Sequence, residues 1–102
     1  MKTLQLYRIT CEVIAELAPV VKAAIAECGI PGCHSQTART VVLRESNLLL
    51  GLFPRTAQEE IPTEVIRFTC PAEFEETVIA CIAHAASLHI PGRGNIYSKP
   101  VT

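Results

Sequence analysis

The first half of the chain shows two kinds of hydrophobic pattern in succession. Residues 4–14 alternate between apolar and polar side chains and are rich in β-branched residues, which predicts a first strand. Apolar positions then recur at helical spacing, which predicts an amphipathic helix that ends before Gly29. Its apolar stripe comprises Leu17, Val20, Val21, Ala24, Ile25 and Cys28. The chain then turns, and residues 33–44 predict a second strand centred on residues 40–43.

The C-terminal part of the chain repeats this order. Residues 64–70 predict a third strand, which Pro71 ends. A second helix is expected from Pro71 to Leu88, with glutamates in its first turn, where the helix dipole favours negative charge. Its apolar stripe comprises Phe74, Val78, either Cys81 or Ile82, Ala85 and Leu88. Residues 95–101 alternate again and predict a fourth strand.

The segment from residue 44 to residue 60 is less regular. Ser46-Asn47 could turn a hairpin that pairs residues 40–44 with 48–53, and the polar residues 54–60 are expected to form a loop. The apolar run 48–53 allows two interpretations, a strand packed on the core or an exposed tip that binds a partner. Long connections on small domains tend to be functional or mobile, so the amides of this segment are expected to exchange fast until a ligand orders it.

The order β-α-β-β-α-β, in two similar halves, predicts a ferredoxin-like α+β fold in a single domain of residues 1–102. One antiparallel sheet would carry both helices on one face, with the long loop between its second and third strands. The other face is left to be covered by neighbouring subunits, and it must be buried between them if it is apolar. Because 49% of the residues are hydrophobic and only 19% are charged, a homo-oligomer is expected.

Charge and targeting signals narrow the class of protein. Nine Lys and Arg against ten Asp and Glu give a formal charge of −1, which is unlike the basic surface that nucleic acid binding requires. The N-terminus has no apolar stretch of signal-peptide length, and no run approaches the length of a membrane span. A cytoplasmic protein without nucleic acid partners or direct membrane insertion is expected.

Five cysteines are many for a chain of this size, namely Cys11, Cys28, Cys33, Cys70 and Cys81. Without a secretion signal, reduced thiols are expected. Neither the spacing of Cys28 and Cys33 nor that of Cys81 and His84 is the C-x-x-C typical of zinc sites, so small buried hydrophobe is the main interpretation and no metal is expected. The sequence also shows no Ser-His-Asp order and no carboxylate pair, so an enzyme is not expected.

Gly92-Arg93-Gly94 lies at the junction between the second predicted helix and the fourth predicted strand. Glycines at both flanks allow the backbone to come close to an anion, since neither has a Cβ and both tolerate positive φ. Arg93 supplies a positive charge at the same place. A tight turn before a strand is the alternative interpretation of this triplet.

Three segments resemble the PII signal-transduction family. Residues 26–32 are similar to that family's A-E-x-G-[IV]-x-G, residues 66–71 to its third strand ending in proline, and residues 92–97 to its G-D-G-K-I-F loop and strand. The three align without a gap, and the resemblance covers nearly the whole chain. It implies a ferredoxin-like trimeric regulator, not an enzyme, that binds adenine nucleotide in the cleft between adjacent subunits.

The resemblance also implies which residues bind the ligand. Phosphate is expected on the glycine loop, at Gly92, Arg93, Gly94 and Asn95, and at the base of the long loop, at Arg39 and Thr40. The adenine is expected near His34 and Thr69.

Departures from the family pattern change the expected ligand. The family's lysine is Asn95 here, its aspartate is Arg93, and the glycine that begins its long loop is Thr40. The C-terminal arginines that hold the outer phosphates have no counterpart in this sequence, so AMP or ADP is expected rather than ATP. Thr56 occupies the position of the tyrosine that enteric members uridylylate, so that modification is not expected.

These features imply a homotrimeric sensor that controls a transporter or a metabolic enzyme through residues 44–60. The branch associated with carboxysomes or bicarbonate transport fits a shortened member best, which makes bicarbonate a further expected ligand and inorganic carbon or nitrogen metabolism the expected context. The alternative is a metal- or thiol-redox-binding trimer similar to CutA proteins, because the chain has five cysteines and three histidines.

Overall fold

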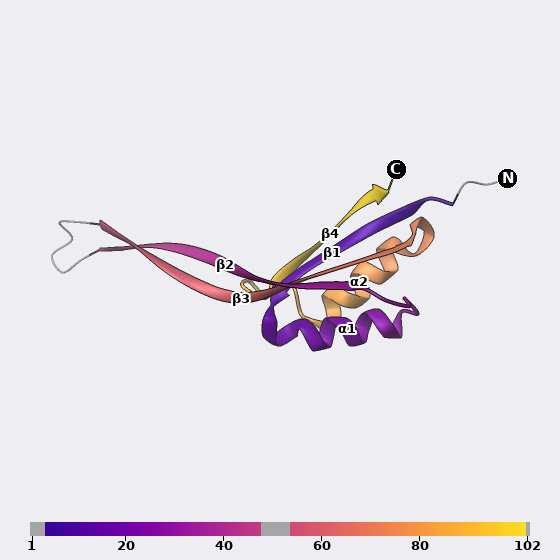
Figure 1. The fold of residues 1–102 in the computed structure, drawn as a ribbon, viewed down its shortest axis with the longest axis horizontal. Coiled ribbons are helices and arrows are strands. Elements are labelled where there is room, and N and C mark those ends of the chain that lie inside the picture. Colours follow the sequence, from indigo (N-terminus) through magenta and orange to yellow (C-terminus); the bar gives the residue numbers. More distant parts are fainter. Residues whose placement is uncertain (1–3, 48–53, 102) are drawn as a thin grey trace.

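A computed structural model describes residues 4–47 and 54–101, with side chains at 4–42 and 59–101. The elements are β1 (Leu6–Ile14), a 3-10 turn (Ala15–Leu17), α1 (Ala18–Glu27), β2 (His34–Asn47), β3 (Pro54–Pro71), a second 3-10 turn (Ala72–Phe74), α2 (Glu75–Ala85) and β4 (Gly94–Val101). The strands form one antiparallel sheet in the order β2-β3-β1-β4, with both helices on one face (Figure 1). The predicted ferredoxin-like fold is confirmed.

The core lies between the helices and one face of the sheet. Alternate residues of β1, namely Ile9, Cys11 and Val13, are at most 1% exposed, because successive side chains of a strand point to opposite faces. The helices contribute Val21 and Ile82, which are completely buried against them. Burying a side chain of this size stabilises the fold by about 1.5–3 kcal/mol.

The second helix buries a different row of residues from the one expected. Phe74 is 52% exposed, since it belongs to the 3-10 turn and α2 begins only at Glu75. The buried positions are Val78, Ile82 and Ala86, which follow one another at spacing i+4 on a single helix face. Ile82 rather than Cys81 therefore faces the core, and the expectation for Ala85 is wrong because Ala86 takes that place.

The predicted loop over residues 54–60 is wrong, because these residues form the first part of β3. Their partners are residues 41–47 of β2, so residues 40–44 pair with 57–61 and not with 48–53. Pairing of β3 with β1 ends at Thr63, and beyond it β2 and β3 continue as a two-stranded ribbon. Residues 48–53, for which two interpretations were given, lie outside the described residues.

The open face of the sheet, opposite the helices, carries both polar and apolar residues. The strand registers place on it the polar residues Arg8, Thr10 and Glu12 of β1, Arg67 and Thr69 of β3, and Tyr97 and Lys99 of β4, together with the apolar residues Leu6, Val65 and Val101. They alternate with residues that face the helices, such as Ile9, Ile66 and Ile96, so the alternation of the strands turns them outward.

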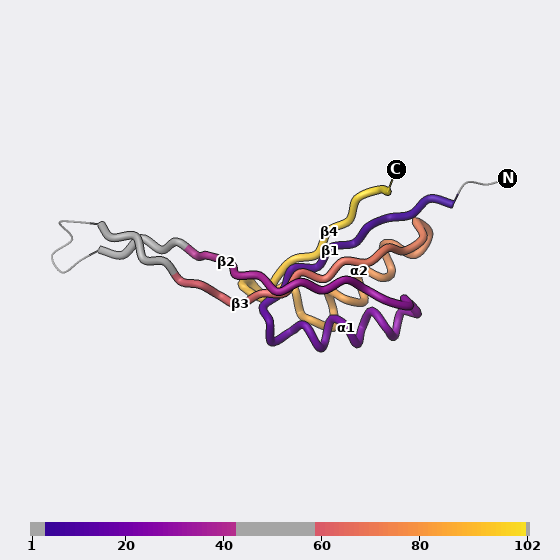
Figure 2. The backbone as a smooth tube through the Cα atoms, viewed as in Figure 1, coloured from indigo at the N-terminus to yellow at the C-terminus, as the bar shows by residue number. Residues whose placement is uncertain are grey.

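Figure 2 traces how the two ends of the sheet differ. The start of β1 runs beside the end of β4, where Leu6 pairs with Val101, and the ribbon of β2 and β3 leaves the sheet at the opposite end. No helix in the part of the chain that the structure describes is long and apolar enough to cross a membrane.

Candidate functional site

A cavity of about 300 Å³ lies where the ribbon leaves the sheet, and we call it the ribbon-base cavity. It brings together the end of β1, the paired strands β2 and β3, and the loop before β4. Its lining residues are Glu12, Val13, Ile14, Thr40, Val42, Ile61, Thr63, Gly92, Arg93, Gly94 and Asn95. The structure therefore brings the predicted phosphate residues 92–95 together with Thr40.

Backbone contacts hold the glycine loop in this place. The amide of Ile14 donates a hydrogen bond to the carbonyl of Arg93 at 3.1 Å, and Gly94 pairs with Val13 at the start of β4. Gly94 has φ +145°, and a Cβ there would meet the carbonyl oxygen of Glu12 and lie 2.8 Å from Cα of Val13. Gly94 therefore lets β4 begin directly against β1.

Gly92 has a different environment from Gly94. Its φ is +85°, in the region that favours glycine, but the space that a Cβ would occupy is open to a distance of 4 Å. The backbone of Gly94 therefore lies close against β1, where a side chain would not fit. At Gly92 there is room beside the backbone for a ligand.

Arg93 is half-buried, and its Nε donates a hydrogen bond to the carbonyl of Ala86 at 2.8 Å. Ala86 caps the C-terminus of α2, where helical carbonyl groups have no partner within the helix and a cation is favoured. A guanidinium has five N–H donors, and this contact uses one of them. The contact joins the glycine loop to α2. Nothing in the sequence indicated this contact.

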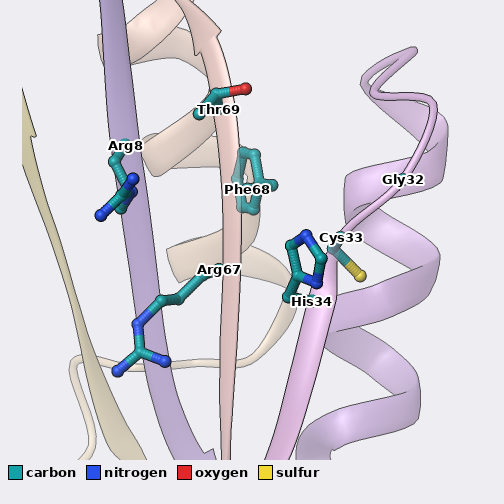
Figure 3. Close-up of a pocket in the computed structure, with 7 residues that line it drawn as sticks. All are labelled: Arg8, Gly32, Cys33, His34, Arg67, Phe68 and Thr69. Carbon is teal, nitrogen blue, oxygen red and sulfur yellow. The ribbon is translucent and has the colours of Figure 1, made fainter. Parts of the chain in front are cut away.

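A second cavity, of about 610 Å³, lies at the other end of the open face (Figure 3). It brings together the predicted residues His34 and Thr69. With them it is lined by Arg8, Gly32, Cys33, Arg67 and Phe68. Sequence reasoning missed both arginines. The alternation of Arg8, Thr10 and Glu12 with Ile9, Cys11 and Val13 is the signal that could have placed Arg8 on the polar face of β1. We call this the arginine cavity.

The two cavities are separate within one chain. His34 and Thr40 are six positions apart on β2, and a strand advances about 3.3 Å per residue, so their Cα atoms are about 20 Å apart. Thr40 lies in the ribbon-base cavity and His34 in the arginine cavity. The predicted site residues thus form two groups on the same molecule.

Arg39 belongs to neither group. Neighbouring residues of a strand point to opposite faces, so Arg39 points away from the side chain of Thr40. Its Nη1 lies 2.8 Å from Oε2 of Glu60 across the ribbon, in an exposed ion pair. In this chain the side chain of Arg39 therefore bridges β2 and β3. It does not line the ribbon-base cavity.

All five cysteines are free thiols. Cys11 and Cys70 are buried, and burial raises the pKa of Cys11 to about 11, which keeps it protonated at neutral pH. Burial, together with a hydrogen bond to the Cys81 thiol, also raises the pKa of Cys28. Within the described ranges 4–47 and 54–101, no three His, Cys, Asp or Glu side chains are grouped so that they could hold a metal ion.

Comparison with known proteins shows likeness in structure but not in sequence. No protein-family model matches the chain, and no curated protein sequence gives a significant match. B. subtilis GlnK in complex with ATP superposes with a TM-score of 0.79 at 11% identity, over 96% of this chain and 85% of that one. A second structure of B. subtilis GlnK gives a TM-score of 0.76 at 10% identity, over 96% and 86%.

A plant protein shows the same fold. Arabidopsis thaliana PII bound to citrate superposes with a TM-score of 0.70 at 18% identity, over 96% of this chain and 78% of that one. These similarities show that the chain has the fold of PII proteins.

Proposed function

We propose that this protein is a PII-like regulatory sensor and not an enzyme. It binds an adenine nucleotide or a small anion and transmits the bound state to a partner through the ribbon of β2 and β3. The observation that carries this proposal is the ribbon-base cavity, which combines the glycine loop 92–95 with Thr40 and Val42 at the foot of the ribbon. A ligand in that cavity contacts the loop and the ribbon together.

This position suits regulation because a ligand shifts a conformational equilibrium only by binding one state more tightly. An isolated two-stranded ribbon is marginally stable in water, so a few contacts at its foot are enough to change its population of ordered states. The open space at Gly92 and the unused donors of Arg93 provide groups that bind phosphate. The fold shared with GlnK solved in complex with ATP supports a nucleotide as the ligand.

The separation of the two cavities supports a subunit interface as the binding site. His34 and Thr69 are too far from residues 92–95 for both groups of one chain to contact the same mononucleotide. Both groups contact one nucleotide only if an adjacent copy supplies the second. We therefore propose a homotrimer in which the phosphate lies in the ribbon-base cavity of one copy and the adenine lies near His34 and Thr69 of the next.

AMP or ADP is proposed in preference to ATP. Asn95 carries no charge where the resembled family has lysine, and Arg93 already uses one donor on Ala86. Fewer cationic contacts favour a ligand with fewer phosphates. We place the protein in the cytoplasm, with a transporter or metabolic enzyme of inorganic carbon or nitrogen metabolism as the partner. Bicarbonate is the small anion to test first, as expected for a member associated with carboxysomes or bicarbonate transport.

Calorimetry and thermal unfolding with AMP, ADP, ATP, cyclic AMP and bicarbonate test the ligand. At a concentration one hundred times its dissociation constant, the true ligand should stabilise the fold by about 2.7 kcal/mol. Sedimentation tests the assembly, which is expected to have three times the mass of the 11.1 kDa chain. A monomer with unchanged stability in every ligand solution would refute the proposal.

A further inference from the structure

We infer that the open face of the sheet carries a separate phosphate-binding site, formed by Arg8, Lys99 and Arg67. We call it the sheet-face site. It is a different place from the ribbon-base cavity, but it shares Arg8, Arg67 and Thr69 with the arginine cavity. Phosphate bound here would therefore compete with the adenine that the proposed function places near His34 and Thr69. Its ligand is a phosphoryl group, either free phosphate or the phosphate of a small metabolite.

The strand register brings the three cations together. Arg8 of β1 pairs directly with Lys99 of β4, and side chains of directly opposed residues in an antiparallel sheet point to the same face. Arg67 of β3 pairs with Thr10, two positions along β1, which makes it a diagonal neighbour of Arg8. Long side chains reach across this spacing. Figure 3 shows the guanidinium of Arg67 extending from β3 towards β1, the strand that carries Arg8.

These cations have no carboxylate partner among the side chains that the structure describes. The ion pairs there are Lys22 with Glu64 and Arg39 with Glu60, which leaves the sheet-face cations out. Glu12 is the acid on the same face, two positions from Thr10 along β1, and its Oε1 accepts a hydrogen bond from the Tyr97 hydroxyl at 3.2 Å.

Like charges placed directly opposite each other destabilise a sheet, so the pairing of Arg8 with Lys99 has a cost in the free chain. A bound anion would remove that cost, because it lies between the two charges and attracts both. The open side of Arg8 provides room for it, since Arg8 lines the arginine cavity of about 610 Å³ and also a smaller one of about 190 Å³ with Lys99.

The donors determine the class of ligand. Guanidinium and ammonium groups only donate hydrogen bonds, so they select groups that only accept, and two arginines favour the oxygens of a phosphate over a neutral ligand. Thr69, which is directly opposite Arg8 on β3, adds a hydroxyl donor at the side of the arginine cavity. Bicarbonate and chloride carry a single charge and should bind more weakly than phosphate.

The test is calorimetric titration of the full chain with inorganic phosphate at low chloride concentration. Arg8→Gln and Lys99→Gln should each weaken phosphate binding by about tenfold or more, as expected for loss of a hydrogen bond to a charged group. Lys22→Gln is the matched control, because it removes one positive charge from the helix-covered side, and it should change the affinity less than about twofold. AMP and adenosine titrations with the same variants distinguish free phosphate from nucleotide phosphate.

Thermal unfolding provides a readout that a structural role would not produce. Without phosphate, Lys99→Gln should melt at the same temperature as the natural chain or higher, because a repulsion has been removed. Phosphate should raise the melting temperature of the natural chain and leave that of Lys99→Gln nearly unchanged. If Arg8→Gln does not fold, Arg8→Lys is measured in its place, because it keeps the charge but loses the planar donor pair.

Three results would overturn the inference. The first is that the natural chain does not bind phosphate. The second is that Arg8→Gln and Lys99→Gln bind phosphate as tightly as the natural chain does. The third is that Lys22→Gln weakens binding as much as they do. Phosphate binding that is lost in Arg93→Ala and kept in Arg8→Gln would assign phosphate to the ribbon-base cavity. That outcome would leave the proposed nucleotide function intact while removing the sheet-face site.

Discussion

The Nε–H of Arg93 donates a hydrogen bond to the carbonyl oxygen of Ala86, with an N–O distance of 2.8 Å. This contact holds the loop before β4 against the C-terminal end of α2. The same loop lines the ribbon-base cavity. A side chain proposed to bind the ligand therefore also holds the loop in the position from which it would do so.

Replacing Arg93 should affect both stability and binding. Arg93→Ala is expected to lower the free energy of unfolding by about 1 kcal/mol and to weaken nucleotide binding by about 1.5–3 kcal/mol, because hydrogen bonds to charged groups are the stronger ones. Urea unfolding and calorimetry measure the two effects. Arg93→Lys, which keeps the charge without the guanidinium, should be intermediate in affinity. Full nucleotide affinity in Arg93→Ala would show that the glycine loop is only a turn.

The two glycines of the loop should differ in their tolerance of a side chain. Gly94→Ala should lower the free energy of unfolding by about 2–4 kcal/mol, because the new Cβ meets the backbone of Glu12 and Val13 at a positive φ. Gly92→Ala meets open space and should cost only about 1–2 kcal/mol of backbone strain. Chemical denaturation of the two variants side by side measures this difference, and equal losses would contradict it.

Glu64 should make stability depend on acid pH. Hydrogen bonds from Lys22, at 2.7 Å, and Ser35, at 2.5 Å, hold the pKa of Glu64 below its ordinary value of 4.5. A lowered folded-state pKa contributes stability that is present above the unfolded pKa and is lost as the pH falls through the folded pKa. The natural chain should therefore be more stable than Glu64→Gln by about 0.5–1 kcal/mol at pH 7, since Lys22 is partly exposed.

The difference between the two proteins should shrink as the pH falls below about 4.5. Urea unfolding from pH 3 to pH 7 measures it. Lys22→Gln, which removes the largest cause of the pKa shift, should show most of the same loss of pH dependence. A difference between the natural chain and Glu64→Gln that stays constant down to pH 3 would exclude this linkage.

The ribbon should be the least protected part of the sheet. Residues 41–47 pair with 54–60 without a third strand beside them, and two-stranded ribbons are marginally stable. Their amides should exchange faster than those of β1 in the free protein and should slow when nucleotide is added. Hydrogen exchange resolved by mass spectrometry measures both. Protection equal to that of β1 without ligand, and unchanged by it, would mean that the ligand does not control the ribbon.

The sequence by itself determined the elements whose side chains carry a periodic signal. The alternation over residues 4–14 predicted β1, because a half-buried strand needs an apolar residue at every second position. The structure shows that Ile9, Cys11 and Val13 form its buried face. Gly29 marked the end of α1 correctly, and its φ of +82° is the conformation that glycine adopts after a helix. Pro71 likewise ends β3.

Only the tertiary structure decided the ribbon and the pairing of distant residues. Residues 54–60 gave no strand signal, because a ribbon paired through its backbone outside the core needs no apolar face. Arg8 and Lys99 are opposite each other only because of the β1–β4 register, and Arg93 reaches Ala86 only because of the turn between α2 and β4. Periodicity reports which face of an element is buried, whereas the partner of each residue depends on how the elements pack.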